Sequence, residues 1–546
     1  MRLGAQPDPA GEHPGVSLCY PDAAHAPNGA RLSRQAAEDI GIATVRERFG
    51  LPEEFLYELC QDVDTIGYRQ SVLADLLASE ELCTVLREVR PMLRELAYFR
   101  TTRKEQSAPL QQAVWRLGEL ETYVSCLQRL ADAAALPDLQ SEGMQVLLAF
   151  VRRRREDPVY QRLVNELPAL RGGLKRRASV SIGINLDDQL RPAEATLLAV
   201  HDEKFAERPL LSRIFGAATP YQPVASIKRV AAMGSLLGDL DRILGAVARP
   251  LAKALGQYVR LQVHDLLALE REIAFYLGAA QLFRALQARG LPVCRPRLAA
   301  AGERHLQVGG LYNVNLALGG SEEAARAIVG NDLDMAAGGR ILVLTGPNQG
   351  GKTTFTRAVG LLQVLAQAGL YAPAASATVS PADVVDTHFP VDEPGHAEGG
   401  RLADEARRLA SIFSAASESS LILMNESLAS TSPSESLYLA EDVVRGLRLL
   451  GARAVFATHL HELGERVDAI NREVDGASRL VSMVAGIESG DTGNGSNGEV
   501  RRTYRIRPGP PVGLSYARDI ARRYGISFDD IRAQLTAKQS STPPPN

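Results

Sequence analysis

The sequence predicts a multidomain protein in which a mainly α-helical region precedes an α/β domain with a mainly parallel sheet. Apolar residues recur at spacings of three and four over residues 34–170, which is typical of packed helices. After residue 291, short β-rich runs alternate with helix-length segments. With 546 residues, 45% of them hydrophobic, the chain is long enough for several cores. We therefore expect a helical core and lever domain over residues 34–290 and an α/β domain over residues 291–535.

Three further segments can be recognised before residue 291. Residues 1–33 are rich in Pro, Gly, Ala and His with little periodicity, which predicts a flexible leader. A β-like run, SVSIGINL from Ser179 to Leu186, interrupts the helices, and a second long helical region covers about 224–290. Helical patterns of this length predict extended helices or levers.

The α/β part has strands predicted at residues 341–345, 421–424 and 454–457, separated by amphipathic segments of helix length. Such alternation predicts a doubly wound, mainly parallel sheet. The polar run GIESGDTGNGSNGEV predicts a disordered loop over residues 486–500, and residues 536–546 are predicted to form a disordered tail.

Cysteine use and hydropathy exclude several classes. The five cysteines show neither CxxC nor paired metal-ligand spacing, which disfavours a disulfide scaffold or a zinc module and fits a reducing compartment. No apolar run approaches the roughly 20 residues that a membrane helix needs. We therefore expect a cytoplasmic protein that does not act at a membrane.

Charge is unevenly distributed although the net value is only −3. Residues 1–150 carry a net −8, whereas residues 151–260 carry 19 Lys and Arg against 11 Asp and Glu, a net +8. The basic stretch includes Arg152, Arg153, Arg154, Arg155, Arg171, Lys175, Arg176 and Arg177. It fits either a solvated helix face or an arm that contacts a polyanion such as DNA through its phosphates.

The segment GPNQGGKT matches G-x-x-x-x-G-K-[ST] between a predicted strand and a predicted helix. In this context backbone amides surround phosphates, Lys352 reaches the β and γ phosphates, and the Thr353 hydroxyl ligates Mg²⁺. The loop therefore predicts binding of ATP with Mg²⁺. The expected nucleotide-binding residues here are Gly346, Pro347, Asn348, Gln349, Gly350, Gly351, Lys352, Thr353 and Thr354.

Catalytic candidates follow two later strands. In LILMNES, Asn425 stands where an ATPase usually has a metal-binding aspartate, so it is expected to hold Mg²⁺ weakly, through water. Glu426 is the candidate that positions or deprotonates the attacking water. His459, after the strand near 454–457, is the candidate γ-phosphate sensor. A metal site at His459, His461 and Glu462 is disfavoured because the i, i+4 histidine pair of H-E-x-x-H is missing.

Four segments, in their order and spacing, resemble the ATPase domain of the MutS family of DNA mismatch repair proteins: TGPNQGGKTTFTRAVG, LILMNESLASTSPSES, FATHLHEL and PVGLSYARDIARRYGI. Asn331 and Asp332 lie where that family places an Asn-Asp pair before the loop, so Asn331 joins the nucleotide-binding candidates. DTIGYRQSVLADLL resembles the start of the family's helical core, and Arg295-Pro296 with GGLYNVNLAL resembles its approach to the nucleotide site. The resemblance covers roughly residues 50–535.

The resemblance implies a dimer with two ATP sites across the subunit interface and lever helices that link nucleotide state to a grip on DNA. Ser430, Thr431 and Ser432 fall on the family's loop that faces the partner site, and the SYARDIA helix falls on its dimer contact. An ordinary capped turn and an ordinary amphipathic helix are the alternatives. Other repair proteins are possible further partners.

The sequence also departs from the family pattern. The helical core begins near residue 50, so we expect neither the N-terminal mismatch-recognition and connector domains nor a Smr-like domain after residue 535. The one Phe-x-Glu, at Phe205 to Glu207, lies in the basic segment and is interpreted as coincidental. EGGRLADEARRL occupies the place of the family's GRSTF stretch, so Leu402 stands where a serine would reach the partner's γ-phosphate.

Together these observations predict a DNA-binding ATPase that acts as a nucleotide-switched dimeric clamp in DNA repair or recombination, with slow hydrolysis. A non-hydrolysing, ATP-dependent interaction scaffold is the alternative that Asn425 and Leu402 favour. An ABC or SMC-type ATPase is disfavoured because no LSGGQ-like segment precedes LILMNE.

Overall fold

The structure is a computed structural model of the 546-residue chain. It describes residues 16–22, 30–101, 109–136, 139–175, 179–186, 188, 192–201, 253–255, 258, 266–336, 338–390, 400–489, 500–511 and 524–540. No helix within these ranges is long and apolar enough to cross a membrane.

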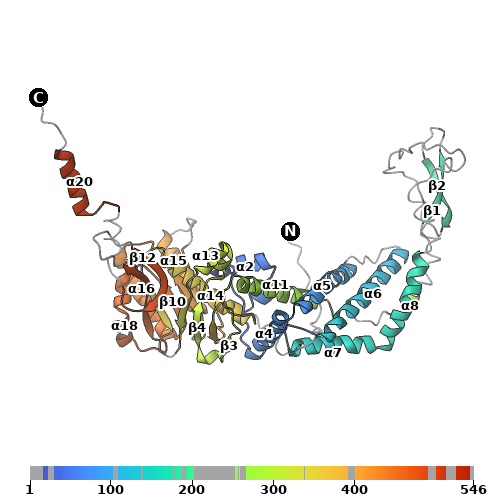
Figure 1. Cartoon of the computed structure of the whole chain (residues 1–546), viewed down its shortest axis with the longest axis horizontal. Coiled ribbons are helices and arrows are strands. Elements are labelled where there is room, and N and C mark those ends of the chain that lie inside the picture. The colour runs from blue at the N-terminus through green and yellow to red at the C-terminus, as the bar shows by residue number, and fades with distance from the viewer. Residues whose placement is uncertain are drawn as a thin grey trace. The chain divides into compact units, whose positions relative to one another are not determined.

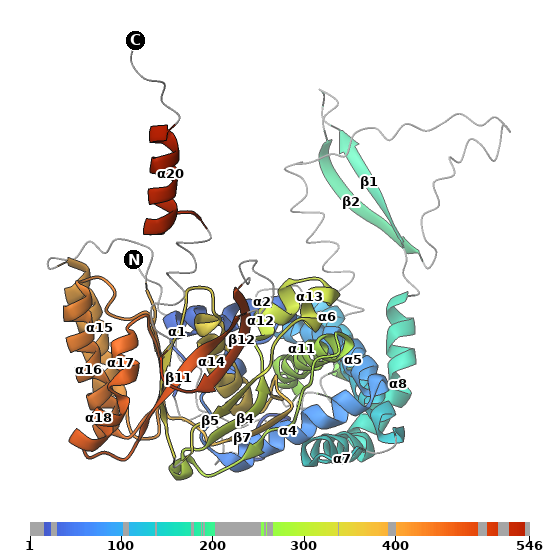
Figure 2. The same cartoon turned by 60° about the vertical axis from the view of Figure 1, so that its left-hand side comes forward.

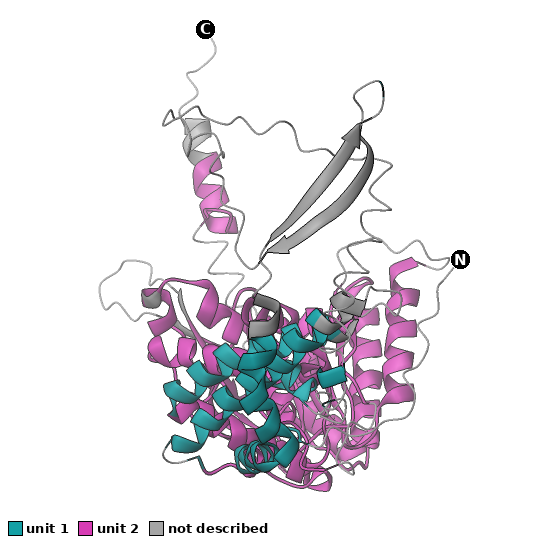
Figure 3. Ribbon diagram, turned by 90° about the vertical axis from the view of Figure 1, so that its right-hand side faces the viewer, with its two compact units in different colours: residues 1–17, 79–139, 144–273 teal, residues 18–78, 140–143, 274–546 magenta. Residues whose placement is uncertain are grey.

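The chain divides into two compact units (Figure 3). Unit 1 comprises Met1–Ser17, Ser79–Leu139 and Met144–Ile273, and unit 2 comprises Leu18–Ala78, Gln140–Gly143 and Ala274–Asn546. The two units do not follow the predicted border at residue 290, because segments on both sides of the helical region fold with the α/β part. Local periodicity indicates that a segment is helical, but it does not indicate which core the helix joins.

Unit 1 is built from long helices and one hairpin. Leu82, Leu86, Val89, Leu93 and Leu96 form a buried stripe at helical spacing along α5, which packs against α6. Helices of 22 and 24 residues span about 33–36 Å, which confirms the expectation of extended helices. The elements are α5 (Glu80–Thr101), α6 (Pro109–Asp132), α7 (Glu142–Glu156), α8 (Pro158–Lys175) and the antiparallel strands β1 (Ser179–Leu186) and β2 (Pro192–His201) (Figure 1).

The larger sheet of unit 2 carries the predicted strands. Its order is β12-β11-β6-β10-β9-β8, and every neighbouring pair is parallel except β11 and β12. A mainly parallel sheet is thereby confirmed. The strands are β6 (Ile341–Thr345), β8 (Val385–His388), β9 (Leu421–Asn425), β10 (Arg453–Ala457), β11 (Leu480–Ser489) and β12 (Val500–Pro508). β6, β9 and β10 are buried throughout, as central parallel strands should be.

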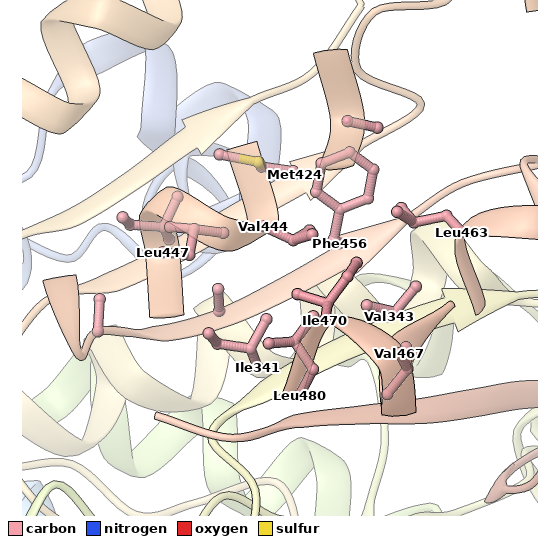
Figure 4. Packing of buried hydrophobic residues seen from close by; sticks show 14 of the residues in the cluster. Ile341, Val343, Met424, Val444, Leu447, Phe456, Leu463, Val467, Ile470 and Leu480 are labelled. Atoms are coloured by element: carbon pink, nitrogen blue, oxygen red, sulfur yellow. The ribbon is translucent and has the colours of Figure 1, made fainter. Parts of the chain in front are cut away.

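Helices cover this sheet (Figures 1 and 2). Alternate residues of the central strands, such as Ile341 and Val343 of β6, point to one face and pack with α15 (Gly400–Ala415), α16 (Pro433–Leu450), α17 (His461–Glu465) and α18 (Val467–Glu473). Figure 4 shows this cluster, in which Phe456 and Met424 lie beside Val444. α14 (Lys352–Gln367) packs against β9 and β10.

A second, four-stranded sheet has the order β3-β7-β4-β5 and was not predicted. Its strands are β3 (Arg297–Leu298), β7 (Ser376–Val379), β4 (Leu306–Leu311) and β5 (Asn331–Asp334). The remaining helices of unit 2 are α1 (Arg34–Ile40), α2 (Ile42–Phe49), α3 (Glu53–Leu56), α4 (Val63–Ala78), α12 (Val314–Gly319), α13 (Glu322–Arg326) and α20 (Phe528–Ser540), with α11 (Leu269–Ala288) beginning at the end of unit 1.

The N-terminal helices join unit 2 through a close approach at Gly360 of α14. A Cβ atom there would lie 2.6 Å from Ile40 of α1 and 2.7 Å from Leu423 of β9. Contacts this short leave no room for a side chain, so glycine lets α14 fit between α1 and the sheet. Residues 34–78 are therefore part of the α/β core and not of a separate helical domain.

Three segments predicted to be disordered are partly ordered. Within the predicted leader, Val16, Leu18, Cys19 and Leu32 are buried. Within the predicted loop 486–500, residues 486–489 belong to β11 and residue 500 to β12, and α20 extends into the predicted tail as far as Ser540. Local composition misled the prediction for the leader and the loop, because cross-strand pairing and burial against distant residues are invisible in a local window. Residues 1–15, 23–29, 490–499 and 541–546 lie outside the described ranges.

A buried arginine of α4, Arg69, contacts the leader and forms an ion pair with Glu58. The Arg69 guanidinium donates to Glu58 Oε2 at 2.7 Å and to the Cys19 carbonyl at 2.9 Å, and it stacks on the Tyr20 ring at 4.6 Å. Both members of the pair are almost fully buried. Gly369 has φ 80°, and a Cβ there would lie 2.2 Å from the Arg69 side chain, so the arginine occupies a tightly enclosed space.

We expect Arg69→Ala to lower the free energy of unfolding of this unit by about 3–5 kcal/mol, because it leaves the Glu58 carboxylate buried and unpaired. Arg407→Ala removes an exposed ion pair with Asp404 in the same unit and serves as the control, with a loss of about 1 kcal/mol or less. Urea unfolding of both variants measures the difference. Equal losses in the two variants would show that the buried pair contributes no more than a surface pair.

Candidate functional site

The glycine-rich loop lies between β6 and α14. Gly346 and Gly351 have φ of 135° and 98°, and Gln349 has φ of 59°. Residues with a side chain rarely adopt such backbone angles. A Cβ on Gly346 would also lie 2.8 Å from Ala485, so glycine is required there. The loop ends at the N-terminus of α14, where unpaired amides and the helix dipole favour an anion.

Lys352 is buried at the start of α14. Its Nζ donates to the carbonyl oxygens of Gly346 at 2.8 Å and Pro347 at 3.1 Å. Burial lowers the pKa of this ammonium below its usual value, and the Glu426 carboxylate opposes the shift. The positive charge is therefore held over the loop and is partly desolvated, which strengthens its attraction for an anion.

Thr353 and Asn425 meet although 72 residues separate them in the chain. The Thr353 hydroxyl donates to Asn425 Oδ1 at 2.9 Å. Asn425 is the last residue of β9 and is buried, and Thr353 follows the loop directly. Their oxygens form a donor set of the type that Mg²⁺ prefers, and both side chains are neutral. The donor set therefore fits a metal ion that is bound chiefly through phosphate and water.

Glu426 and His459 form the second pair at this edge of the sheet. His459 Nε2 lies 2.7 Å from Glu426 Oε1, and the Glu426 amide donates to the Ala457 carbonyl at 2.8 Å. The hydrogen bond from His459 lowers the pKa of Glu426, and the charges of His459 and Lys352 add to the shift, while burial opposes it. The carboxylate is therefore ionised at neutral pH and available as a base.

Within the part of the chain that the structure describes, Asn331 forms hydrogen bonds with strand β12 and not with the glycine-rich loop. Its Nδ2 donates to the Tyr504 carbonyl at 3.1 Å, and its Oδ1 accepts from the Ile506 amide at 2.7 Å. Tyr504 has φ of 55° and is 47% exposed, and a Cβ on Gly351 would lie 3.7 Å from its ring. Sequence reasoning missed Tyr504, because a single tyrosine in the strand VRRTYRIRP gives no signal of its place beside the loop.

The residues thought to face a partner have other local roles. Ser432 caps α16 in a reciprocal capping box with Glu435, and Thr431 also donates to Glu435. Leu402 of α15 packs against the hydrophobic cluster of Figure 4. These contacts agree with the capped-turn alternative for Ser432, whereas Ser430 is exposed. The SYARDIA segment and Phe205 to Glu207 lie outside the described ranges.

The basic run of unit 1 lies on the last turns of α7. Arg152, Arg153 and Arg155 are exposed, and Arg154 stacks on the Phe150 ring at 5.1 Å. Farther along, Arg171 of α8 lies 3.5 Å from Glu121. Lys175 is the last residue of α8, and Arg176 and Arg177 lie outside the described ranges. Three exposed arginines thus lie within four residues of the last turns of α7.

The fold and site define an α/β protein in which a glycine-rich strand-loop-helix and a polar pair lie at the carboxyl ends of adjacent parallel strands. Residues 61–289 match the MutS2 N-terminal domain, and residues 342–500 match MutS domain V. The chain belongs to the MutS family.

Three relatives illustrate the similarity. An endonuclease MutS2 of Thermomicrobium roseum is 35% identical over 211 residues, which cover 38% of this chain and 24% of that protein. A DNA mismatch repair protein MutS 2 of Halobacterium salinarum is 33% identical over 208 residues, which cover 38% of this chain and 22% of that protein. A DNA mismatch repair protein MutS of Synechococcus is 40% identical over 149 residues, which cover 26% of this chain and 16% of that protein. The chain thus spans less than a quarter of the length of these relatives.

Proposed function

We propose that this chain is a P-loop ATPase that binds ATP at residues 346–354, hydrolyses it slowly and couples the nucleotide to DNA repair or recombination. The observation that carries the proposal is the convergence of Lys352, the Thr353–Asn425 pair and the Glu426–His459 pair at one edge of the sheet. The match to MutS domain V supports it.

Each residue has a distinct role in the proposal. Lys352 contacts the β and γ phosphates, and the loop amides surround them. Magnesium, when bound, would neutralise phosphate charge, with Thr353 and Asn425 holding it. Glu426 accepts a proton from the attacking water, and His459 orients that carboxylate and senses the γ-phosphate. Because Asn425 is neutral, the metal is held less firmly than by a carboxylate, and slow turnover follows.

Steady-state phosphate release by the purified chain tests the proposal. Release that depends on Mg²⁺ and on Lys352 supports catalysis. Release no faster than that of Lys352→Ala, with ATP still bound by the wild-type protein, would instead support the non-hydrolysing scaffold that Asn425 and Leu402 favour.

Tyr504 is the proposed platform for the adenine base. Its exposed ring lies beside the loop, and Asn331 fixes the backbone on both sides of it. A flat aromatic ring in this position can stack on a base.

We expect Tyr504→Ala to weaken ATP binding about 5–150-fold, because stacking contributes about 1–3 kcal/mol per base. Affinity for inorganic tripolyphosphate, which has no base, should stay unchanged. Tyr438→Ala, at an exposed tyrosine of α16, is the matched control. Isothermal titration with both ligands decides the matter: equal losses for ATP and tripolyphosphate would contradict a role in stacking.

Dimerisation is a further part of the proposal. Phe528, Ile531 and Leu535 lie at helical spacing on α20 and are 76%, 41% and 55% exposed. An apolar face of this kind is typical of a protein contact. A second copy of the chain is the proposed occupant, and another family member is the alternative.

DNA is the proposed polyanion partner, bound through backbone phosphates at Arg152, Arg153 and Arg155. We expect simultaneous replacement of these three arginines by alanine to weaken duplex binding. The slope of log affinity against log salt should become shallower by about 0.9 for each phosphate that the variant no longer neutralises. Arg129→Ala, at an arginine paired with Glu88, is the control. Fluorescence anisotropy over a salt series measures both quantities. An affinity that is independent of salt, or unchanged by the triple replacement, would exclude these arginines.

A further inference from the structure

The turn that carries Glu426 is strained. Glu426 and Leu428 have φ of 51° and 65°, in the left-handed region that side chains other than glycine rarely occupy. They flank Ser427, so two unfavourable conformations fall within three residues. Such a turn persists only where surrounding contacts impose it, and here it sets the direction of the proposed catalytic carboxylate.

Contacts from several elements hold this turn. The Leu428 amide donates to Glu405 Oε2 of α15 at 2.6 Å, and the Leu428 carbonyl accepts from Ser436 at 2.6 Å. Ser427, which lies between Glu426 and Leu428, contacts His388, the last residue of β8. His388 is only 1% exposed and Ser427 only 4%, so this central contact is shielded from water.

The hydrogen bonds of Ser427 define the state of His388. The Ser427 hydroxyl donates to the His388 carbonyl at 3.0 Å, which leaves its oxygen able to accept from His388 Nδ1 at 2.8 Å. Burial and the Arg408 charge lower the pKa of His388 to about 4, so the ring is neutral at neutral pH. His388 therefore contacts the Ser427 hydroxyl twice, through its ring and through its backbone carbonyl.

We propose that His388 is a positioning residue for ATP hydrolysis, which through its double contact with Ser427 holds the adjacent Glu426 carboxylate against His459. This inference rests on the proposed ATPase function. His388 touches neither the loop nor His459 through any hydrogen bond of the described residues, so it acts through Ser427. A displacement of about 1 Å in a catalytic group can lower a rate about 100-fold. Loss of the contact between His388 and Ser427 should therefore slow hydrolysis measurably.

The chain offers a closely matched pair of serines for the test. Ser427 and Ser420 follow and precede the same strand, β9, and both are buried with two hydrogen bonds through the side chain. Ser420 donates to Asp383 at the opposite end of the strand, away from Glu426. Ser427→Ala and Ser420→Ala therefore remove similar hydrogen bonds, but only the first lies beside the proposed catalytic residue.

Turnover and ATP affinity should separate in these variants. We expect Ser427→Ala and His388→Leu to lower kcat about 10–100-fold with ATP Kd within about threefold of the wild-type value. Ser420→Ala should keep its kcat. His388→Asn, whose amide can donate in place of Nδ1, should restore most of the rate. The double variant Ser427→Ala/His388→Leu should be no slower than the slower single variant, because both changes remove one shared hydrogen bond.

Crystal structures of the same variants give a readout that needs no hydrolysis. We expect the 2.7 Å hydrogen bond between Glu426 and His459 to be broken in Ser427→Ala and His388→Leu and kept in Ser420→Ala and His388→Asn. If the wild-type chain does not hydrolyse ATP, the proposed ATPase activity fails, and the Glu426–His459 distance still decides whether His388 positions this pair. An unchanged distance in Ser427→Ala, or a kcat that falls equally in Ser420→Ala, would overturn the inference.

Discussion

Replacing Glu426 by glutamine is expected to slow ATP hydrolysis about 10²–10⁴-fold, the usual contribution of a general base. Glutamine has nearly the same shape and can still contact His459, but it cannot accept a proton from water. The lowered pKa of Glu426 keeps the carboxylate ionised at neutral pH, so the wild-type base is in its active form. Affinity for ATP should be retained, because the phosphates are bound by the loop and Lys352.

Glu462→Gln is the control for this prediction. Glu462 lies nearby on α17 and is exposed, so its replacement removes the same charge without touching the Glu426–His459 pair. Phosphate release and ATP binding should be measured for both variants. Loss of activity in Glu462→Gln to the same extent would mean that net charge near the site, and not the base, controls the rate.

Replacing Lys352 by alanine is expected to weaken ATP binding by about 10–100-fold or more, since a charged hydrogen bond contributes about 1.5–3 kcal/mol and Lys352 serves two phosphates. The ammonium is held at the loop by the Gly346 and Pro347 carbonyls, so it is already in place when phosphate arrives. Equilibrium titration with ATP measures the loss.

Lys352→Arg separates charge from geometry in this test. The planar guanidinium keeps the charge but does not reproduce the compact ammonium that donates to the Gly346 and Pro347 carbonyls, so intermediate affinity is expected. Thermal unfolding of each variant monitors the fold. Wild-type affinity in Lys352→Ala would show that nucleotide, if bound, is not held by this loop.

The strand-loop-helix around Gly346 could be predicted from sequence because its determinants are contiguous. β6 is a short apolar run, the glycines supply the unusual angles, and α14 follows with a largely apolar sequence that is buried on nearly all sides. Asn425, Glu426 and His459 were placed correctly at strand ends because carboxyl ends of parallel strands meet at one edge. The pairing of Glu426 with His459 then follows from β9 and β10 being neighbours.

What escaped prediction depends on partners far away in the chain. Tyr504 reaches the loop only because β12 pairs with β11 and Asn331 fixes its backbone. Likewise, His388 and Ser427 meet because β8 pairs with β9, and neither residue belongs to a recognisable pattern. The leader was misjudged for the same reason, since Arg69 orders it from 50 residues away. Composition describes local polarity but not such tertiary contacts.

A single-turnover experiment tests the central claim, that this chain binds ATP at the loop and hydrolyses it through Glu426. Protein in excess over labelled ATP and with Mg²⁺ is quenched in acid at increasing times, and the bound nucleotide is identified. We expect the wild-type chain to convert bound ATP to ADP and phosphate while Glu426→Gln retains intact ATP over the same period. ATP that stays intact on the wild-type chain as long as on Glu426→Gln would contradict the claim.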